Sequence, residues 1–371
     1  MKFEINSIKF VKIINQVGKA RNKNNLNPLL SNIHIKIEDN SLTVRATNLE
    51  MTCEKSISVK SLTNGECLIN GDVLVKISNH FTNIDTNITC EIDNDIFYIS
   101  YLKVKLQLKT YPFENFPSFP NLGDKISNID TKMLIDLIKS VYFCAASTEI
   151  KPEISSIYIY TNANSLYSVA TDSFRLAEKK IILESEIGDI NILISQKNIS
   201  ELMSILESSL EDGDNMIEIY NNENILTLQN SNMSLSVRSI NGNFPDYKQL
   251  FPKKWDTKVI VNKNELKNIL NLSTVFINNY SYIDLEIDSK ENIIKTKTKN
   301  DKIGSLEKET KLSFLEGEEI LSSYNSNYFL DGISHINGET IELLFTQNNK
   351  PMFIRDSNNE SFTYLLMPLN K

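Results

Sequence analysis

The chain has 371 residues, of which 41% are hydrophobic and 23% are charged, and this composition is that of a folded protein. Its length exceeds one ordinary hydrophobic core and predicts two or three domains. No basic, apolar leader opens the sequence, and no apolar run approaches the roughly 18 residues of a membrane helix, so we expect a cytoplasmic protein without membrane contact. The formal net charge of −8 on its own argues against nucleic acid as a partner.

The residues that usually form metal, cofactor or catalytic sites do not cluster in this sequence. The cysteines Cys53, Cys67, Cys90 and Cys144 are scattered without CxxC spacing, which indicates buried or incidental thiols. The three histidines are far apart, and the sequence has no GxGxxG, Walker or GxSxG pattern. We therefore expect no cofactor and no metal.

Three segments of the chain begin with a short strand and an amphipathic helix. Residues 2–5 predict a strand, Ser7 a helix N-cap, and the same order returns with Thr131 and again with Asn262, which pairs with Glu265 as a capping box. The apolar positions that follow at helical spacing are Phe10, Ile13, Ile14 and Val17; Leu134, Leu137, Ile138 and Val141; and Leu266, Ile269 and Leu270. Each helix is thus apolar on one face only.

A strand pair follows the first helix in each of the first two segments. Residues 31–35 and 40–48 have counterparts at 155–159 and 164–172, and the offset of 124 residues holds without a gap. Second helices are expected at 72–81, 197–207 and 326–336. The chain is therefore predicted to be three α+β copies of about 120 residues, each with two helices packed on antiparallel sheet. We expect domains at 1–121, 125–250 and 254–371.

The stretch Val169–Ala177 carries a feature that the repeat does not explain. A strand breaks at Thr171-Asp172-Ser173, a cluster of turn formers, and Phe174-Arg175-Leu176 follows without helical or strand period. The first copy repeats the strand end as Ala46-Thr47-Asn48 but has no aromatic–arginine pair. An ordinary strand, turn and strand explains the first half of the stretch, whereas the second half favours contact with a partner.

Basic residues gather on the first helix of each copy, on the face opposite the apolar stripe. They are Lys9, Lys12, Lys19, Lys132, Lys139, Lys263 and Lys267; Arg21 and Lys23 follow the first of these helices, and Lys76 and Lys197 start or lie on the second helices. A solvated helix face explains one such helix, but the same bias on three equivalent helices predicts a positive surface that neutralises phosphates without reading bases.

Six short motifs, in order along the chain, resemble a known family, the bacterial DNA polymerase III beta subunits, or DNA sliding clamps. They are Met1-Lys2-Phe3, Asn27-Pro28-Leu29-Leu30-Ser31-Asn32, Thr47-Asn48-Leu49-Glu50-Met51, Val169–Ala177, Asn243-Phe244-Pro245-Asp246-Tyr247 and Tyr364-Leu365-Leu366-Met367-Pro368-Leu369. The resemblance implies the DNA clamp fold and a head-to-tail ring dimer. It also implies a non-catalytic processivity subunit that encircles double-stranded DNA and tethers the polymerase III alpha subunit, is opened by a clamp loader, and binds other polymerases and repair proteins.

The resemblance implies three sets of contact residues. A hydrophobic groove for partner peptides would use Thr171, Ser173, Phe174, Arg175, Leu176, Pro245, Gln249, Leu250, Pro351, Leu365, Leu366, Met367, Pro368 and Leu369. The dimer interface would use Ile77, Phe81, Lys103 and Lys105 of one chain against Phe276, Ile277, Glu307 and Glu309 of the other. Among the DNA contacts, the family often has arginine where Asn24 stands, with Lys23 and Arg21 as the candidate substitutes, and Lys151 keeps the charge of a second family arginine.

Two other classes of function compete with the clamp. An enzyme could use Asp172 and Arg175, but no nucleophile–base pair accompanies them. A peptide-binding repeat scaffold without a DNA function is the alternative, and the lysine-bearing helix faces count against it.

Overall fold

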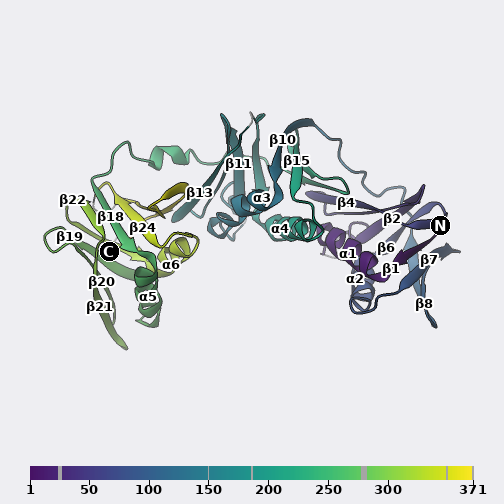
Figure 1. Ribbon diagram of the computed structural model, residues 1–371, viewed down its shortest axis with the longest axis horizontal. Helices are drawn as coiled ribbons and strands as arrows, with labels where there is room; N and C mark the ends of the chain where they lie inside the picture. Colours follow the sequence, from purple (N-terminus) through teal and green to yellow (C-terminus); the bar gives the residue numbers. More distant parts are fainter. Residues whose placement is uncertain (24–26, 149, 185–186, 277–281, 348–349, 370–371) are drawn as a thin grey trace. The chain divides into compact units, whose positions relative to one another are not determined.

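The computed structural model describes residues 1–23, 27–148, 150–184, 187–276, 282–347 and 350–369 (Figure 1). The chain forms two compact units: unit 1 comprises Met1–Ile135 and Leu183–Ile240, and unit 2 comprises Asp136–Ile182 and Asn241–Lys371. Each unit thus combines one end of the chain with part of its middle.

Unit 1 is built on an antiparallel sheet with the strand order β10-β15-β16-β17-β4-β3-β2-β6-β9-β8-β7-β1-β5. The strands of this sheet are β1 Lys2–Asn6, β2 Asn32–Glu38, β3 Ser41–Thr47, β4 Met51–Ser58, β5 Lys60–Thr63, β6 Gly65–Asn70, β7 Asn87–Asp93, β8 Ile96–Tyr101, β9 Val104–Tyr111, β10 Asp124–Asp130, β15 Met216–Asn222, β16 Ile225–Gln229 and β17 Met233–Arg238. Unit 1 also contains β14 Asn191–Ser195, which is not part of this sheet. Its helices are α1 Ser7–Val17, α2 Gly71–Asn79 and α4 Gln196–Glu211. Helix α1 packs against both α2 and α4. The pairing of β17 with β4 makes the sheet continuous between the first and second copies of the repeat.

Unit 2 contains two antiparallel sheets, in which the strands run β11-β12-β13-β26-β25-β24-β18-β22 and β21-β20-β19-β23. Its strands are β11 Ser156–Asn162, β12 Ser165–Thr171, β13 Arg175–Ile182, β18 Thr257–Asn262, β19 Tyr282–Asp288, β20 Ile293–Asn300, β21 Gly304–Lys311, β22 Phe314–Gly317, β23 Ile320–Asn325, β24 Thr340–Phe345, β25 Met352–Asp356 and β26 Asn359–Leu366. Helices α5 Lys263–Ser273 and α6 Ser326–Ser334 pack on each other, and α3 Thr131–Lys139 spans the boundary between the units.

The predicted helices are present, with their apolar faces in the core. The apolar positions named for α1, α3 and α5 are at most 4% exposed. Burial of these faces removes about 25 cal/mol of unfavourable hydration per Å² of apolar surface, which fixes each helix against its sheet. The α+β class with antiparallel sheets is therefore confirmed.

Two of the three predicted N-caps are wrong by one residue. Asn6 caps α1, because its Oδ1 accepts from the N–H groups of the second and third helical residues at 3.0 and 3.4 Å. Asp130 likewise accepts from the third residue of α3 at 2.9 Å. Ser7 and Thr131 are the first residues of the helices themselves, and their hydroxyls donate to backbone carbonyls elsewhere in unit 1. Asn262 is confirmed as the cap of α5, with a bond of 3.0 Å.

The offset of 124 residues recurs in the strands themselves. Strands β2, β3 and β4 begin at Asn32, Ser41 and Met51, and β11, β12 and β13 begin 124 residues later with the same lengths. The repeat seen in the sequence is thus a repeat of three consecutive paired strands.

Candidate functional site

The turn between β12 and β13 is held by its own side chains. Thr171 Oγ1 donates to the carbonyl of Arg175 at 2.7 Å, and Asp172 Oδ1 accepts from the N–H groups of Phe174 and Arg175 at 2.9 and 3.0 Å. Ser173 completes the turn with a φ of 76°. These bonds leave Phe174 60% exposed, so its ring is accessible to a partner.

The same turn occurs in unit 1, between β3 and β4. Thr47 Oγ1 donates to the carbonyl that opens β4 at 3.0 Å, and Asn48 Oδ1 accepts from the N–H of Glu50 at 3.0 Å. Leu49 has a φ of 75°, the counterpart of the positive φ in unit 2. The backbone is thus repeated, whereas the side chains after Thr47 and Thr171 differ, and Glu50 stands where the second copy has Phe174.

Arg175 braces the turn of unit 2 rather than offering a free cation. Its Nε donates to Asp172 at 2.9 Å, its Nη1 to Asp331 on α6 at 2.6 Å, and its Nη2 to the carbonyl of Phe143 at 3.0 Å. The guanidinium also lies 4.2 Å from the centre of the Tyr328 ring and is only 12% exposed. Arg175 therefore ties the turn to α6, and its contribution to a partner site is positional.

A cluster of buried apolar side chains lies next to the turn. Its members are Val169, Leu176, Tyr247, Leu344, Phe353 and Leu365, with Tyr158, Tyr160, Phe244, Phe251, Trp255 and Met367 packed against it. Phe244 and Tyr247 were named from the sequence only within a family motif, and Phe251 and Trp255 were not predicted. Their recurrence at intervals of three to four residues is the signal that could have identified them.

The structure brings some of the predicted groove residues together within unit 2. Phe174 and Met367 are joined by a backbone bond of 2.9 Å, and β13 pairs with β26 so that Leu176 lies opposite Leu365. Ser173, Phe174, Pro245, Gln249 and Leu250 are exposed, Pro351, Met367, Pro368, Leu369 and Arg175 are intermediate, and Thr171, Leu176, Leu365 and Leu366 are buried. The buried members belong to the core of unit 2, and the exposed members are the ones that a partner can touch.

Most of the predicted DNA-facing residues of unit 1 have protein partners. Lys19 donates to the carbonyl and hydroxyl of Ser204 at 3.1 and 2.7 Å, and burial lowers the pKa of its amine. Arg21 pairs with Asp72 at 2.6 Å. Within the described ranges, the side chains of Lys9, Lys76, Lys132, Lys151 and Lys267 form no ion pair, Lys263 donates to the carbonyl of Ile336, and Lys139 is exposed.

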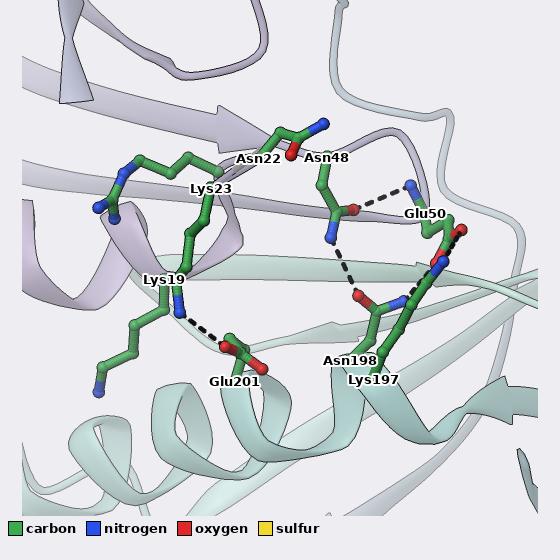
Figure 2. Close-up of a pocket in the computed structure, with 9 residues that line it drawn as sticks. Lys19, Asn22, Lys23, Asn48, Glu50, Lys197, Asn198 and Glu201 are labelled. Atoms are coloured by element: carbon green, nitrogen blue, oxygen red, sulfur yellow. Dashed lines mark hydrogen bonds and ion pairs between the residues drawn. The ribbon is translucent and has the colours of Figure 1, made fainter. Parts of the chain in front are cut away.

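A cavity of about 270 Å³ lies between the end of α1 and the start of α4 (Figure 2). It is lined by Lys19, Arg21, Asn22, Lys23, Asn48, Glu50, Lys197, Asn198 and Glu201. Lys23 pairs with Glu201 at 2.7 Å, and Lys197 pairs with Glu50 at 2.7 Å. Four cations therefore converge on one cavity, but none of them is without an internal partner. Asn24, next in the chain to Lys23, lies outside the described residues.

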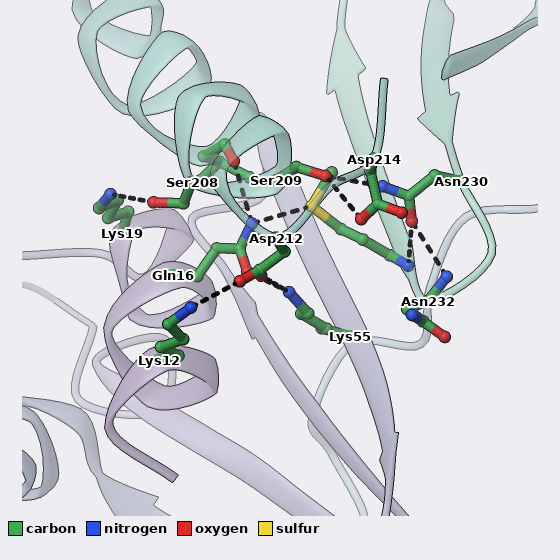
Figure 3. A network of polar contacts seen from close by, with 12 residues as sticks. Lys12, Gln16, Lys19, Lys55, Ser208, Ser209, Asp212, Asp214, Asn230 and Asn232 are labelled. Atoms are coloured by element: carbon green, nitrogen blue, oxygen red, sulfur yellow. Dashed lines mark hydrogen bonds and ion pairs between the residues drawn. The ribbon is translucent and has the colours of Figure 1, made fainter. Parts of the chain in front are cut away.

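A second polar network ties α1 to α4 (Figure 3). Asp212 accepts from Lys55 at 2.6 Å and from Lys12 at 3.1 Å, and Lys55 also donates to Gln16 Oε1 at 2.7 Å. Burial alone would raise the pKa of Asp212, but the hydrogen bonds and charges of the two lysines hold that pKa below its usual value. Lys55, whose side chain is 7% exposed, was not predicted from the sequence.

The predicted dimer-interface residues differ in accessibility. Lys103 and Lys105 are exposed beside β9, Glu307 and Glu309 are exposed on β21, and Ile77 and Phe276 are half-buried. Phe81 is 1% exposed and packs edge-on against Tyr101, so it lies under the surface of unit 1. Ile277 lies outside the described residues.

The remaining chemistry-bearing residues do not assemble into a site. The four cysteines are free and buried, and burial raises the pKa of Cys53 and of Cys67 to about 12, which keeps both as inert thiols. Among the residues that the structure describes, no group of acidic, histidine and cysteine side chains could hold a metal ion. In the same part of the chain, none of the helices has the length and apolar character to span a membrane.

Comparisons with known proteins match a single family over nearly the whole chain. The family models for the N-terminal, central and C-terminal domains of the DNA polymerase III beta subunit match residues 1–120, 128–246 and 248–370. The beta sliding clamp of Streptococcus pneumoniae is 23% identical over 377 residues, covering 99% of this chain and 98% of that protein. The DNA polymerase sliding clamp of Bacillus subtilis superposes with a TM-score of 0.92 at 24% identity, covering 100% of this chain and 99% of that one. The Pseudomonas aeruginosa clamp bound to griselimycin has a TM-score of 0.92 at 21% identity, covering 100% of both chains.

Proposed function

Since the chain belongs to the family of bacterial DNA polymerase III beta subunits, we propose that it is a sliding clamp, a non-catalytic cytoplasmic subunit that makes the replicative polymerase processive. The observation that carries the proposal is the succession of three family-model matches over nearly the whole chain. The peptide-binding scaffold without a DNA function is not favoured, because it leaves the basic helix faces unexplained.

As a clamp, the protein works as a ring of two chains with domains 1–121, 125–250 and 254–371. Free sheet edges suit this assembly. Strand β21 ends its sheet, and the first half of β9 pairs only with β8 among the described strands. Antiparallel pairing of β9 of one chain with β21 of the other would satisfy both edges. Lys103 and Lys105 would then face Glu307 and Glu309, a complementary charge pattern.

The basic helix residues supply the contact with double-stranded DNA. Phosphate contacts of lysines carry no sequence information, so a ring held by topology can slide along any sequence. Exposed Lys9, Lys76 and Lys132 are suited to this contact, because their ammonium groups are in solvent. Net negative charge elsewhere on the chain does no harm to a protein that is threaded onto its substrate.

The surface around Phe174 is the proposed site for short peptides of the polymerase, the clamp loader and repair proteins. An exposed aromatic ring over a buried apolar floor accepts apolar anchors of a peptide. Phe174, Leu250 and Met367 would contact the anchors, and Arg175 would keep the turn in place. The corresponding turn of unit 1 carries Glu50, so one such site per chain is expected.

The decisive experiment is retention on circular against linear DNA after loading by the clamp loader. A ring stays on closed circles and slides off linear ends, and its native mass is that of a dimer. Replacing Lys9, Lys132 and Lys267 by alanine should reduce loading, whereas the same change at the strand residues Lys60, Lys125 and Lys299 should not. Equal retention on circles and linear duplexes would rule out the topological mechanism.

A further inference from the structure

We propose that Glu50 and Glu201 act as internal competitors of DNA phosphate: they hold Lys197 and Lys23 in ion pairs that duplex DNA must break, and thereby weaken the grip of the clamp. This inference rests on the proposed function and adds a tuning mechanism to its DNA-binding face.

The cavity in Figure 2 contains two kinds of cation. Lys19 and Arg21 are anchors, because Lys19 bonds to Ser204 on α4 and Arg21 bonds to the carbonyl of Gly18 as well as to Asp72. Their donors are used within the fold. Lys23 and Lys197 have side chains that are 55% and 50% exposed, so they are the cavity's candidates for contact with a polyanion.

The fold holds the two carboxylates that pair with these lysines in place. Glu50 Oε1 accepts from Lys197 at 2.7 Å, while its Oε2 accepts from Asn198 Nδ2 at 2.7 Å. Asn48 in turn donates to Asn198 Oδ1 at 2.9 Å. The turn that precedes Glu50 is held by hydrogen bonds, so the carboxylate is presented toward α4 before any ligand arrives. Glu201 lies on α4 itself, at 2.7 Å from Lys23.

Exposed pairs of this kind are weak enough to be exchanged. Ion pairs in solvent contribute little to stability, so a DNA phosphate can take over a lysine at small cost. The exchange leaves a bare carboxylate close to the phosphate, and the two anions repel each other. Each lysine therefore gains less from DNA than a lysine without a partner would, and fewer counterions are released in total. A weak, nearly uniform grip is what a protein that slides along DNA requires.

Asp212 also lies near these helices, but it does not compete with DNA phosphate. It pairs with Lys55, whose side chain is buried, and its removal would leave a buried charge without a counterion. Asp212 is therefore structural, and it is excluded from the test.

The test compares the double variant E50Q/E201Q with the wild type and with E218Q. Glu218 on β15 pairs with Lys125 at 2.5 Å, and it alternates with the buried Ile217 and Ile219 on the sheet. The E218Q control removes one negative charge from an exposed pair away from the cavity, and the single variants E50Q and E201Q, which each remove one charge, are measured beside it. The readout is the anisotropy of a fluorescein-labelled short duplex, measured on the full-length protein from low to physiological salt.

Freeing both lysines should tighten duplex binding by about three- to tenfold at low salt, the size expected for two exposed pairs. It should also steepen the dependence of log Kd on log salt by about 0.9 for each lysine that becomes available to a phosphate. E218Q should match the wild type, and the thermal unfolding midpoint should not change in any variant. A K23A/K197A variant should bind more weakly than the wild type.

The outcomes separate the two proposals. If E50Q/E201Q matches E218Q in both Kd and salt slope while K23A/K197A weakens binding, the competitor inference is wrong and the DNA face stands. If the wild type shows no affinity for duplex and K23A/K197A changes nothing in loading, the DNA face is wrong, and the inference is lost with it.

Discussion

Replacing Asp212 by asparagine should destabilise unit 1 more than any single change in an exposed ion pair. Lys55 lies on β4, and its buried ammonium group bonds to Asp212 at 2.6 Å and to Gln16 at 2.7 Å. Asparagine keeps the shape of the side chain but removes the negative charge. The ammonium group of Lys55 then stays in the protein without a counterion (Figure 3).

The size of the effect follows from the burial of the two partners. Removal of one member of a fully buried pair costs about 3–5 kcal/mol. The Asp212 side chain is 22% exposed, and Gln16 remains as an acceptor for the ammonium group of Lys55. Solvent and the Gln16 amide therefore offset part of the cost, and we expect D212N to lower the free energy of unfolding by about 2–3 kcal/mol. For a folding unit of this size, such a loss lowers the unfolding midpoint by about 5–10 °C.

Circular dichroism and tryptophan fluorescence followed during heating distinguish the units. The single tryptophan, Trp255, lies in unit 2, so its transition serves as an internal reference while circular dichroism reports both units. The double variant K55M/D212N should recover most of the loss, because methionine needs no counterion. A D212N midpoint no lower than that of E218Q would refute the reasoning.

Two further predictions concern pH and the partner site. Burial lowers the pKa of His34 despite its bond to Glu66, so the unfolded chain takes up a proton more readily than the folded protein. The contribution of His34 to the free energy of unfolding should be full above about pH 6.5 and should fall as the pH drops through the lower pKa of the folded state. In urea titrations at several pH values, H34Q should flatten this dependence on pH. Replacing Phe174 and Met367 by alanine should weaken the binding of a fluorescent polymerase-derived peptide by more than tenfold, since such apolar anchors contribute about 2 kcal/mol each. The native mass of the variant protein should not change. An unaltered peptide Kd would remove this surface from the proposed site. The matched control is I182A, which truncates an exposed apolar side chain at the other end of β13.

Features set by local sequence were predicted well. The helix faces were found from spacing alone, because burial of an apolar stripe is decided within one helix and its sheet. The repeat was found because strands β2 to β4 return with the same lengths in β11 to β13. The caps predicted at Ser7 and Thr131 are wrong because the residue before each, Asn6 and Asp130, supplies the capping oxygen. The hydroxyls of Ser7 and Thr131 bond to carbonyls 77 and 83 residues away, which the local sequence does not indicate.

Features set by distant partners were not predictable. The lysine faces looked uniformly free in the sequence, yet Lys23 finds Glu201 at a separation of 178 residues and Lys55 finds Asp212 at 157. Arg175 looked like a contact for a partner, but Asp331, 156 residues away, takes up one of its donors. Composition gives the number of charges, and only the fold decides which of them remain available to a ligand.

The two copies of one turn show how a repeat can separate two functions. The hydrogen bonds that hold the turn come from Thr47 and Asn48 in unit 1, and from Thr171 and Asp172 in unit 2, and they end on backbone groups. The side chain just after the turn takes no part in them, so it can change without loss of the turn. In unit 1 that position holds Glu50, whose carboxylate pairs with Lys197 in the cavity of Figure 2. In unit 2 it holds Phe174, which is exposed next to a cluster of buried apolar side chains, so the same backbone presents a carboxylate to a cation in one copy and an apolar surface in the other.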